Sequence, residues 1–270
     1  MPVFNNKPPA HSNGAGSVTL VGAGPGDPEL LTLRSVRALQ EADVILIDNL
    51  VAPAILDFAR REARKMMVGK TGYGPSCRQD EINAMMISLA KSGKRVVRLK
   101  GGDPMIFGRA GEEIAACQAA GIPVEVVPGI TSAQGAASRL GVSLTQRELA
   151  RRVQYITAHG ASGRLPADID WPSVADPSTT TVVYMPKHTL AELAATALAH
   201  GIAPDTPAIA VASATRPDEQ VISATIATIA AQLAHAAPAG PVLVMIGQAL
   251  GVALVQQVSE RATVERNLAS

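Results

Sequence analysis

Short apolar runs alternate along the chain with longer segments in which apolar residues recur every three or four positions. The runs at 18–21, 44–47 and 96–99 have the length and composition of buried strands. The segments at 79–92 and 131–140 have the spacing of helices with one apolar face. Strands that alternate with helices are typical of a mostly parallel, doubly wound sheet. We therefore predict an α/β protein.

The same patterns extend the prediction to the rest of the chain. Further helices are predicted from about 28 and at 53–63, 111–120, 189–200 and 224–236. Further strands are predicted at 64–69, 124–127, 153–157, 181–185, 208–212 and 242–246. Residues 159–177 are rich in Gly, Pro, Asp and Ser and are predicted to form one long loop, of the kind that often serves as a lid.

A chain of 270 residues is long enough for two domains with separate cores. We expect an amino-terminal α/β domain at 17–130 and a carboxyl-terminal α/β domain at 131–256. The residues at 1–16 mix Pro, Asn, Ser and Gly without periodicity and are expected to be a disordered tail. Residues 257–270 are expected to form a second tail.

Composition and charge narrow the possible partners. The net charge of +1 argues against nucleic acid or an anionic membrane as a general partner. The most apolar segment, 222–245, is interrupted by polar residues, Pro and Gly, and is not predicted to span a membrane. Only 17% of the residues are charged, which indicates that much surface is buried, and a subunit interface would account for it.

Cysteine and histidine usage indicates neither a disulfide nor a metal site. Cys77 and Cys117 lie forty residues apart, which suits a reducing cytoplasm and makes a disulfide between them unexpected. The amino terminus lacks the pattern of a signal peptide, so we expect a soluble cytoplasmic protein. The five histidines have no ligand spacing, and no metal is predicted.

The segment Gly101-Gly102-Asp103-Pro104 is the strongest candidate for a binding site. It follows a predicted buried strand, and open α/β sheets bind ligands at the carboxyl ends of their strands. The two glycines allow the backbone to approach a ligand closely, and Asp103 adds a lone carboxylate. The sequence therefore predicts a small-molecule site here.

A second glycine-rich turn, Gly22-Ala23-Gly24, follows the first predicted strand. It does not fit the dinucleotide-binding pattern, because the positions that would need a third glycine are Asp27 and Glu29. Asp48 does imitate the acid that binds ribose in such proteins. A nicotinamide-dependent dehydrogenase is therefore a disfavoured alternative.

Three motifs in register carry a resemblance to a known family. They are the segments Val-Gly-Ala-Gly-Pro-Gly-Asp-Pro-Glu-Leu-Leu-Thr-Leu at 21–33, Gly-Gly-Asp-Pro-Met-Ile-Phe-Gly-Arg at 101–109 and Val-Val-Pro-Gly-Ile-Thr-Ser-Ala at 126–133. Together they resemble the tetrapyrrole methylases, which are S-adenosylmethionine (SAM)-dependent methyltransferases of corrin and sirohaem synthesis.

The resemblance implies a fold and an activity. The expected fold is two α/β domains of the tetrapyrrole methylase type, not a Rossmann methyltransferase, with the active site in the cleft between them. The implied activity is C-methylation of uroporphyrinogen III at two pyrrole carbons in succession, giving precorrin-2 by way of precorrin-1. The implied cofactor is SAM, with S-adenosylhomocysteine as its product, and the implied assembly is a homodimer. We expect this chain to methylate without an appended dehydrogenase or chelatase domain.

The resemblance also implies which residues form the site. Those expected to bind SAM are Pro25, Gly101, Gly102, Asp103, Ile106, Thr131, Ser132, Met185 and Ala214. Acid–base roles are implied for Asp48 and Lys70, which each follow a predicted strand. The alternatives are that Thr131 and Ser132 only cap a helix, that Asp48 is a solvated turn residue, and that Lys70 binds a substrate carboxylate.

Uroporphyrinogen carries eight carboxylates, so arginines are expected to line its site. The candidates are Arg109, Arg147 and Arg151, with Arg78 and Arg152 nearby in the sequence. The alternative for Arg151 and Arg152 is that this run of charges is only a solvated face. The chain departs from the family at Gln146, where a histidine is common.

Two other functions stay open. One is methylation of a later corrin intermediate, although the segment 100–109 favours the early substrate. The other is a non-catalytic protein that senses SAM or a tetrapyrrole, which would bind its ligand without turnover. Whether the product feeds sirohaem or cobalamin is not encoded in these motifs.

Overall fold

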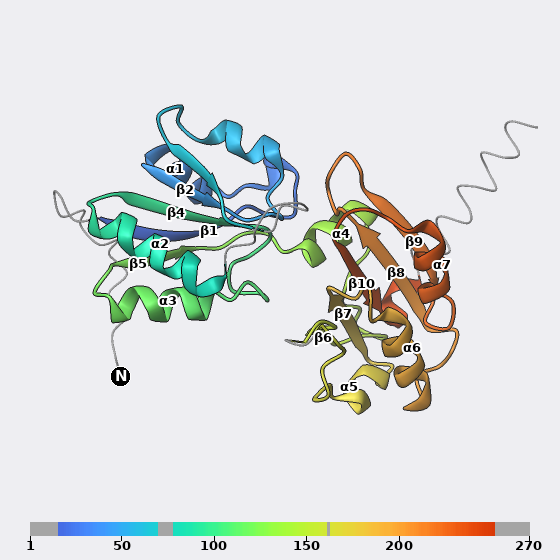
Figure 1. Ribbon diagram of the computed structural model, residues 1–270. Coiled ribbons are helices and arrows are strands. Elements are labelled where there is room, and N and C mark those ends of the chain that lie inside the picture. Colours follow the sequence, from blue (N-terminus) through green and yellow to red (C-terminus); the bar gives the residue numbers. More distant parts are fainter. Residues whose placement is uncertain (1–15, 70–77, 161–162, 252–270) are drawn as a thin grey trace, which may run out of the picture. The chain divides into compact units, whose positions relative to one another are not determined.

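The computed structural model describes residues 16–69, 78–160 and 163–251 (Figure 1). They form two compact units, of which the first ends at Ile130 and the second begins at Thr131. Except for Gly16, the expected tails at 1–16 and 257–270 lie outside the described residues. No helix of the described part is long and apolar enough to cross a membrane.

A five-stranded parallel sheet forms the centre of the first unit. Its strands are β1 (Ser17–Gly22), β2 (Val44–Ile47), β3 (Arg64–Met67), β4 (Arg95–Lys100) and β5 (Val124–Val127). Their order is β3-β2-β4-β1-β5, so the apolar β4 is the central strand. Every pair is parallel, which confirms the predicted topology and brings all five carboxyl ends to one edge.

Helices cover both faces of this sheet (Figure 1). On one face lie α1 (Leu33–Glu41) and two 3-10 helices, η1 (Pro28–Leu30) and η2 (Pro53–Phe58), and Leu39 and Ile55 are fully buried there. On the other face lie α2 (Gln79–Lys91) and α3 (Ala110–Ala119), whose Met86 and Cys117 are fully buried. Each face thus has its own apolar core.

The first helix differs from its prediction. It was expected from about Pro28, but a 3-10 turn comes first and α1 begins at Leu33. Two separate caps explain the break, because the Asp27 carboxylate accepts from the backbone N–H of Glu29 while the hydroxyl of Thr32 caps α1. The helix predicted at 53–63 is only the 3-10 helix η2.

The second unit contains a mixed sheet. It follows α4 (Ser132–Leu140) and consists of β6 (Arg152–Thr157), β7 (Thr179–Tyr184), β8 (Pro207–Ala212), β9 (Gln220–Thr225) and β10 (Val242–Ile246). Their order is β6-β7-β10-β8-β9. Only β6 and β7 pair in parallel, because β10 runs antiparallel to β7 and β8, and β9 antiparallel to β8.

Helices also cover both faces of this second sheet. Along the chain the other elements are α5 (Trp171–Ala175), α6 (Leu190–Ala199), α7 (Ile229–Ala236) and the 3-10 helix η3 (Gln248–Leu250). The core on one face includes Leu193 of α6 and Ile229 of α7. The core on the other face includes Ala136 of α4 and Leu250 of η3.

Three predictions for this unit differ from the structure. The strand β9 was not predicted, and the helix expected at 224–236 begins only at Ile229. As an edge strand, β9 pairs with β8 alone and exposes Gln220 and Val221, so it lacks the apolar run of a buried strand. The loop expected at 159–177 contains the short helix α5, which Asp170 caps and which has a proline in its first turn.

Candidate active site

Three glycine-containing segments meet at the carboxyl edge of the first sheet. The backbones of Gly24 and Gly102 hydrogen-bond to each other in both directions, at 3.2 Å and 2.7 Å. A Cβ on Gly22 would lie 2.5 Å from the backbone N of Gly129, and a Cβ on Gly129 would lie 2.2 Å from the carbonyl of Gly102. Only glycine fits these contacts, so the predicted glycine-rich turns do meet here.

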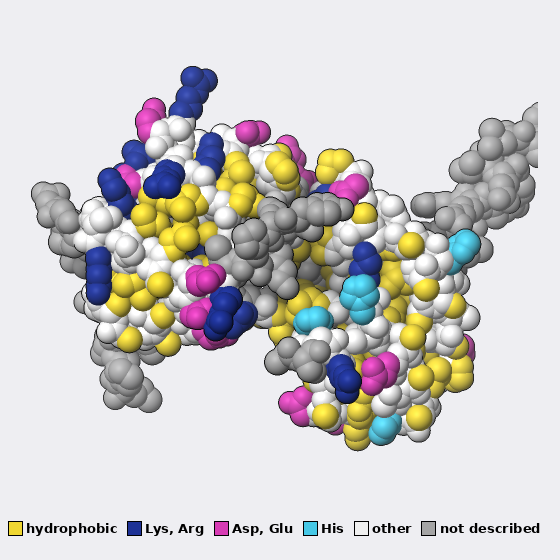
Figure 2. Space-filling model, in the orientation of Figure 1, with side chains coloured by type: hydrophobic (Ala, Val, Ile, Leu, Met, Phe, Trp, Pro, Cys, Tyr) yellow, Lys and Arg dark blue, Asp and Glu magenta, His cyan; other side chains and the backbone are white. Residues whose placement is uncertain are grey.

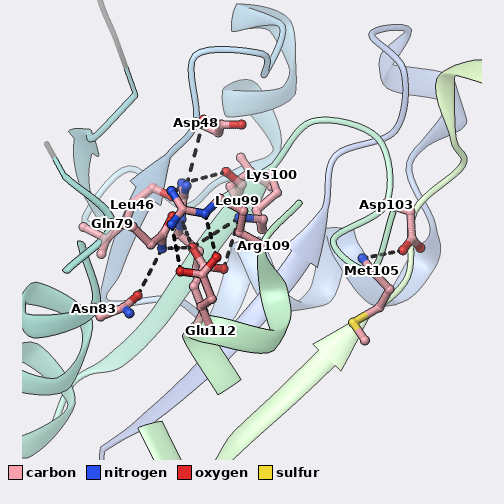
Figure 3. A network of polar contacts seen from close by, with 12 residues as sticks. Leu46, Asp48, Gln79, Asn83, Leu99, Lys100, Asp103, Met105, Arg109 and Glu112 are labelled. Carbon is pink, nitrogen blue, oxygen red and sulfur yellow. Dashed lines mark hydrogen bonds and ion pairs between the residues drawn. The ribbon is translucent and has the colours of Figure 1, made fainter. Parts of the chain in front are cut away.

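The carboxylate of Asp103 joins two of these segments. One oxygen accepts a hydrogen bond from the backbone N–H of Gly129 at 2.9 Å. The other accepts from the N–H of Met105 at 2.7 Å, as Figure 3 shows. Asp103 therefore shapes the loop after β4, and any contact with a ligand would be made in addition to these two bonds.

The rest of this loop is tightly wound. Phe107 and Arg109 have positive φ angles of 50° and 56°, a conformation that non-glycine residues adopt at an energetic cost. A Cβ on Gly108 would lie 2.4 Å from the carbonyl of Pro104. Ile106 is half-buried and donates its N–H to the carbonyl of Asp103 at 3.2 Å. The segment is thus a preformed, strained loop, as functional sites often contain.

The other predicted SAM-binding residues of this unit lie beside the same edge. Pro25 is buried directly after the backbone pair of Gly24. A Cβ on Gly101 would lie 2.8 Å from the Cβ of Leu50, so the chain after β2 packs against the loop after β4. The structure therefore brings Pro25, Gly101, Gly102, Asp103 and Ile106 to one edge of the first sheet.

Asp48 follows β2 at this edge and faces a buried group of charges (Figure 3). Its carboxylate lies 3.9 Å from the guanidinium of Arg98, and its side chain keeps 28% of its surface exposed. Arg98 and Lys100 extend from β4, and both contact the fully buried carboxylate of Glu113 on α3. Burial, followed by the nearby charge of Arg98, lowers the pKa of the Lys100 ammonium.

The sequence analysis did not single out this group of Arg98, Lys100 and Glu113. Two signals could have revealed it. Arg98 and Lys100 alternate in a strand that was predicted to be buried, and buried cations require a counter-charge. Glu113 lies three residues after Ala110 and four before Cys117, both buried, so it shares their helical face.

Lys70, the other predicted acid–base residue, lies outside the described residues. Arg78, at the start of α2, is exposed and its Nε lies 3.2 Å from Asp80. Arg109 is exposed as well, and its Nε and Nη2 each donate to the carboxylate of Glu112 at 2.7 Å. This bidentate pair raises the pKa of Arg109 and lowers that of Glu112.

The second unit collects its predicted SAM-binding residues at one edge of its own sheet. Thr131 and Gln134 form a capping box at the start of α4, so the helix-cap role exists. Thr131 and Ser132 also lie against the hydroxyl of Tyr184, the last residue of β7. Burial is the main cause that raises the pKa of this tyrosine.

Met185 and Ala214 lie at the same edge of this sheet. Met185 follows β7 with a φ of 57° and is 44% exposed. Ala214, buried after β8, lies between two residues of positive φ, Ser213 and Thr215. Because β10 runs antiparallel to both β7 and β8, the carboxyl ends of these two strands point the same way.

The arginines of the second unit lie on an exposed loop. Arg147 and Arg151 are exposed, and Arg151 donates its Nε to the carbonyl of Arg147 at 2.9 Å. Arg152 begins β6 and forms an ion pair with Asp176.

On the face seen in Figure 2, basic and acidic side chains are interspersed over the first unit. Among the described residues, no three His, Cys, Asp or Glu side chains group as a metal site would require.

Comparison with known proteins gives matches over most of the chain. Residues 17–230 match the family described as Tetrapyrrole (Corrin/Porphyrin) Methylases. The siroheme synthase of Methylococcus capsulatus is 48% identical over 237 residues, which are 88% of this chain and 50% of that protein. The siroheme synthase of Chromobacterium violaceum is 46% identical over 239 residues, again half of its length. The chain thus spans about half the length of these curated relatives.

Solved structures match most of this chain and nearly all of their own length. The uroporphyrin-III C-methyl transferase of Thermus thermophilus, in complex with S-adenyl homocysteine, has a TM-score of 0.75 and 38% identity. The match covers 87% of this chain and 99% of that chain. A cobalt precorrin-4 methyltransferase has a TM-score of 0.77 at 26% identity, over 87% of this chain and 95% of that one.

Proposed function

Because the chain belongs to the tetrapyrrole methylase family, we propose that it is a SAM-dependent C-methyltransferase acting on uroporphyrinogen III. Two successive methylations would give precorrin-2 by way of precorrin-1. The observation that carries this proposal is the 38% identity over 99% of the Thermus thermophilus uroporphyrin-III C-methyl transferase. The proposal concerns methylation alone, since the chain spans only half of its siroheme synthase relatives.

The glycine cradle supports SAM as the cofactor. The cradle consists of the segments around Gly22, Gly102 and Gly129, where backbone meets backbone with no room for a Cβ, so this part of the sheet edge carries no side chains at these positions. Such a surface suits a ligand that is held largely by backbone hydrogen bonds. The residues proposed to hold SAM are Pro25, Gly101, Gly102, Asp103, Ile106, Thr131, Ser132, Met185 and Ala214.

Bound SAM would supply a methyl group already activated on a sulfonium. The chain must then hold the pyrrole carbon in line with that methyl group and accept the proton that the macrocycle loses at each methylation. We assign the base role to Asp48, whose carboxylate is 28% exposed and directly follows β2 at the same sheet edge as the glycine cradle. Lys70 is proposed as the partner acid–base residue on resemblance alone.

Arginines are proposed to bind the substrate carboxylates. Arg109, Arg147 and Arg151 are all exposed. The guanidinium of Arg109 already holds a carboxylate in bidentate geometry, that of Glu112, which a carboxylate of the substrate could replace. We include Arg147 and Arg151 because they lie on one exposed loop, with the side chain of Arg151 turned back onto the backbone of Arg147.

We further propose a cytoplasmic homodimer. The low charged fraction of 17% supports a buried subunit interface. Cys117 is a buried free thiol, which fits a reducing compartment. Light scattering on the purified protein tests the dimer, and a monomer at micromolar concentration would contradict it.

The decisive experiment is anaerobic turnover of uroporphyrinogen III with methyl-labelled SAM, followed by mass analysis of the tetrapyrrole. We expect two labelled methyl groups per macrocycle, with the singly methylated species appearing first. Transfer only to a later corrin intermediate would favour the alternative function, which is methylation of such an intermediate. The cobalt precorrin-4 methyltransferase, which matches this chain at a lower identity of 26%, represents that alternative. SAM binding without any transfer would favour a sensor.

A further inference from the structure

Glu113 is a carboxylate with no exposed surface, at the first turn of α3. Its Oε1 accepts hydrogen bonds from Nε of Arg98 at 3.0 Å, Nζ of Lys100 at 3.2 Å and Nε2 of Gln79 at 3.1 Å. Its Oε2 lies 3.1 Å from the same ammonium group. A charge is tolerated at such depth only when it is paired and hydrogen-bonded, and here two cations from β4 meet that condition.

Arg98 connects this buried carboxylate to Asp48. While Nε donates to Glu113, Nη2 lies 3.9 Å from Oδ1 of Asp48. Nη1 donates to the backbone carbonyls of Leu46 and Leu99, at 3.5 Å and 3.4 Å. A planar guanidinium that is held on three sides has a fixed direction, so the edge that it presents to Asp48 is also fixed.

The net charge of the four groups is zero only when all four are counted together. Arg98 and Lys100 contribute two positive charges, and Glu113 and Asp48 contribute two negative ones. The side chains of Arg98, Lys100 and Glu113 are 4%, 5% and 0% exposed, whereas that of Asp48 is 28% exposed. The group is thus anchored inside the first unit, and of its four members Asp48, labelled in Figure 3, is the one with a partly exposed carboxylate.

We propose that Glu113 is a positioning residue, which holds Arg98 and Lys100 and thereby orients the Asp48 carboxylate for proton removal. The proposal rests on the function assigned above to Asp48. Because Glu113 has no exposed surface, it acts only through its two cations. Without its charge, two buried cations would compete for the one remaining carboxylate, and Asp48 would turn inward toward them.

A double-mutant cycle tests this role. Single-turnover methyl transfer is measured with saturating SAM for the wild type, Glu113→Gln, Asp48→Asn and the double variant. Because Glu113 acts through Asp48, Glu113→Gln should slow transfer about 10-fold when Asp48 is present and about 2-fold or less in the Asp48→Asn background. Affinity for S-adenosylhomocysteine should stay within about 2-fold in all four proteins.

A matched control is available at the other end of β2. Asp43 also bridges two arginines, Arg60 and Arg95, but it precedes the strand that Asp48 follows. Asp43→Asn should lower stability without slowing transfer in either background. If Asp43→Asn shows the same dependence on Asp48, the effect of Glu113 is structural and the proposal is overturned.

The outcomes separate this inference from the proposed function. No methyl transfer by the wild type refutes the proposed function itself. An active wild type with equal losses from Glu113→Gln in both backgrounds, or with no loss at all, refutes the positioning role alone. If Glu113→Gln does not fold, Gln79→Ala replaces it, since it removes one of three donors to Oε1 and should slow transfer about 3-fold only when Asp48 is present.

Discussion

The carboxylate of Asp103 accepts a hydrogen bond from the backbone N–H of Gly129 at 2.9 Å, although 26 residues separate them in the chain. This bond links the loop after β4 to the segment that follows β5. A single side chain therefore holds together two of the three glycine-containing segments that form the proposed SAM site.

Asp103→Ala should weaken binding of S-adenosylhomocysteine about 10- to 100-fold, because the N–H groups of Met105 and Gly129 lose their acceptor and the loop loosens. Calorimetric titration measures the affinity. Asp170→Ala is the matched control, since that carboxylate also caps a backbone N–H, but on α5 of the second unit. Unchanged affinity in Asp103→Ala would remove Asp103 from the proposed site.

Gly129→Ala should destabilise the protein by about 1–3 kcal/mol, because the new Cβ would lie 2.2 Å from the backbone carbonyl of Gly102, which cannot move without disturbing the cradle. Thermal unfolding measures the change, and affinity for S-adenosylhomocysteine should fall with it. Gly111→Ala is the control, since nothing lies within 4 Å of its added Cβ and alanine favours the helix α3. Equal melting temperatures for the two variants would contradict the close contact.

Asp43 should make stability depend on pH at the acid end. Its contacts, chiefly the hydrogen bond from Arg95, lower the pKa of its carboxyl from 3.8 to about 2. Since the folded pKa is the lower one, the stabilisation is complete above the unfolded value and is lost as the pH falls from about 4 toward 2. Wild type should therefore exceed Asp43→Asn by about 1–2 kcal/mol at pH 6, and by progressively less below pH 4.

Urea unfolding of both proteins between pH 3 and 6 measures that difference. A gap that stays constant over this range would show that the ionised carboxylate is not what stabilises this end of the sheet.

Thr131→Ala should lower stability by about 1 kcal/mol, because α4 loses the hydroxyl that accepts from the N–H of Gln134. Thr131→Ser keeps that oxygen and should restore the stability. If Thr131 also contacts SAM, as proposed, Thr131→Ala should weaken S-adenosylhomocysteine binding while Thr131→Ser does so less. A loss of stability with unchanged affinity would leave the helix cap as its role.

The fold of the first unit could be predicted almost completely from its sequence. Its buried parallel strands are short apolar runs, and helices with apolar stripes separate them, so periodicity alone identifies the α/β class. The second sheet was harder to predict from the sequence. The direction of β10 depends on its pairing with β7 and β8, which are distant in sequence, and no local pattern encodes that direction.

The residues of the candidate site also differ in how well the sequence identifies them. The glycines at 101 and 102 could be identified because a bare turn after a strand leaves a local signature. Glu113 could not be identified so easily, because an acid in the first turn of a helix is normally a solvated partner of the helix dipole. Its burial follows from the rotation of α3 on the sheet, and only its spacing from Ala110 and Cys117 indicated that.

The edge strand β3 exposes two cations, Arg64 and Lys65, at the outer side of the parallel sheet. Unpaired backbone groups on such an edge can recruit a strand from another molecule and start aggregation. A short strand with exposed charged side chains is a poor template for a foreign strand. The short, basic β3 therefore protects the first unit from edge-to-edge association at the high concentrations of a cell.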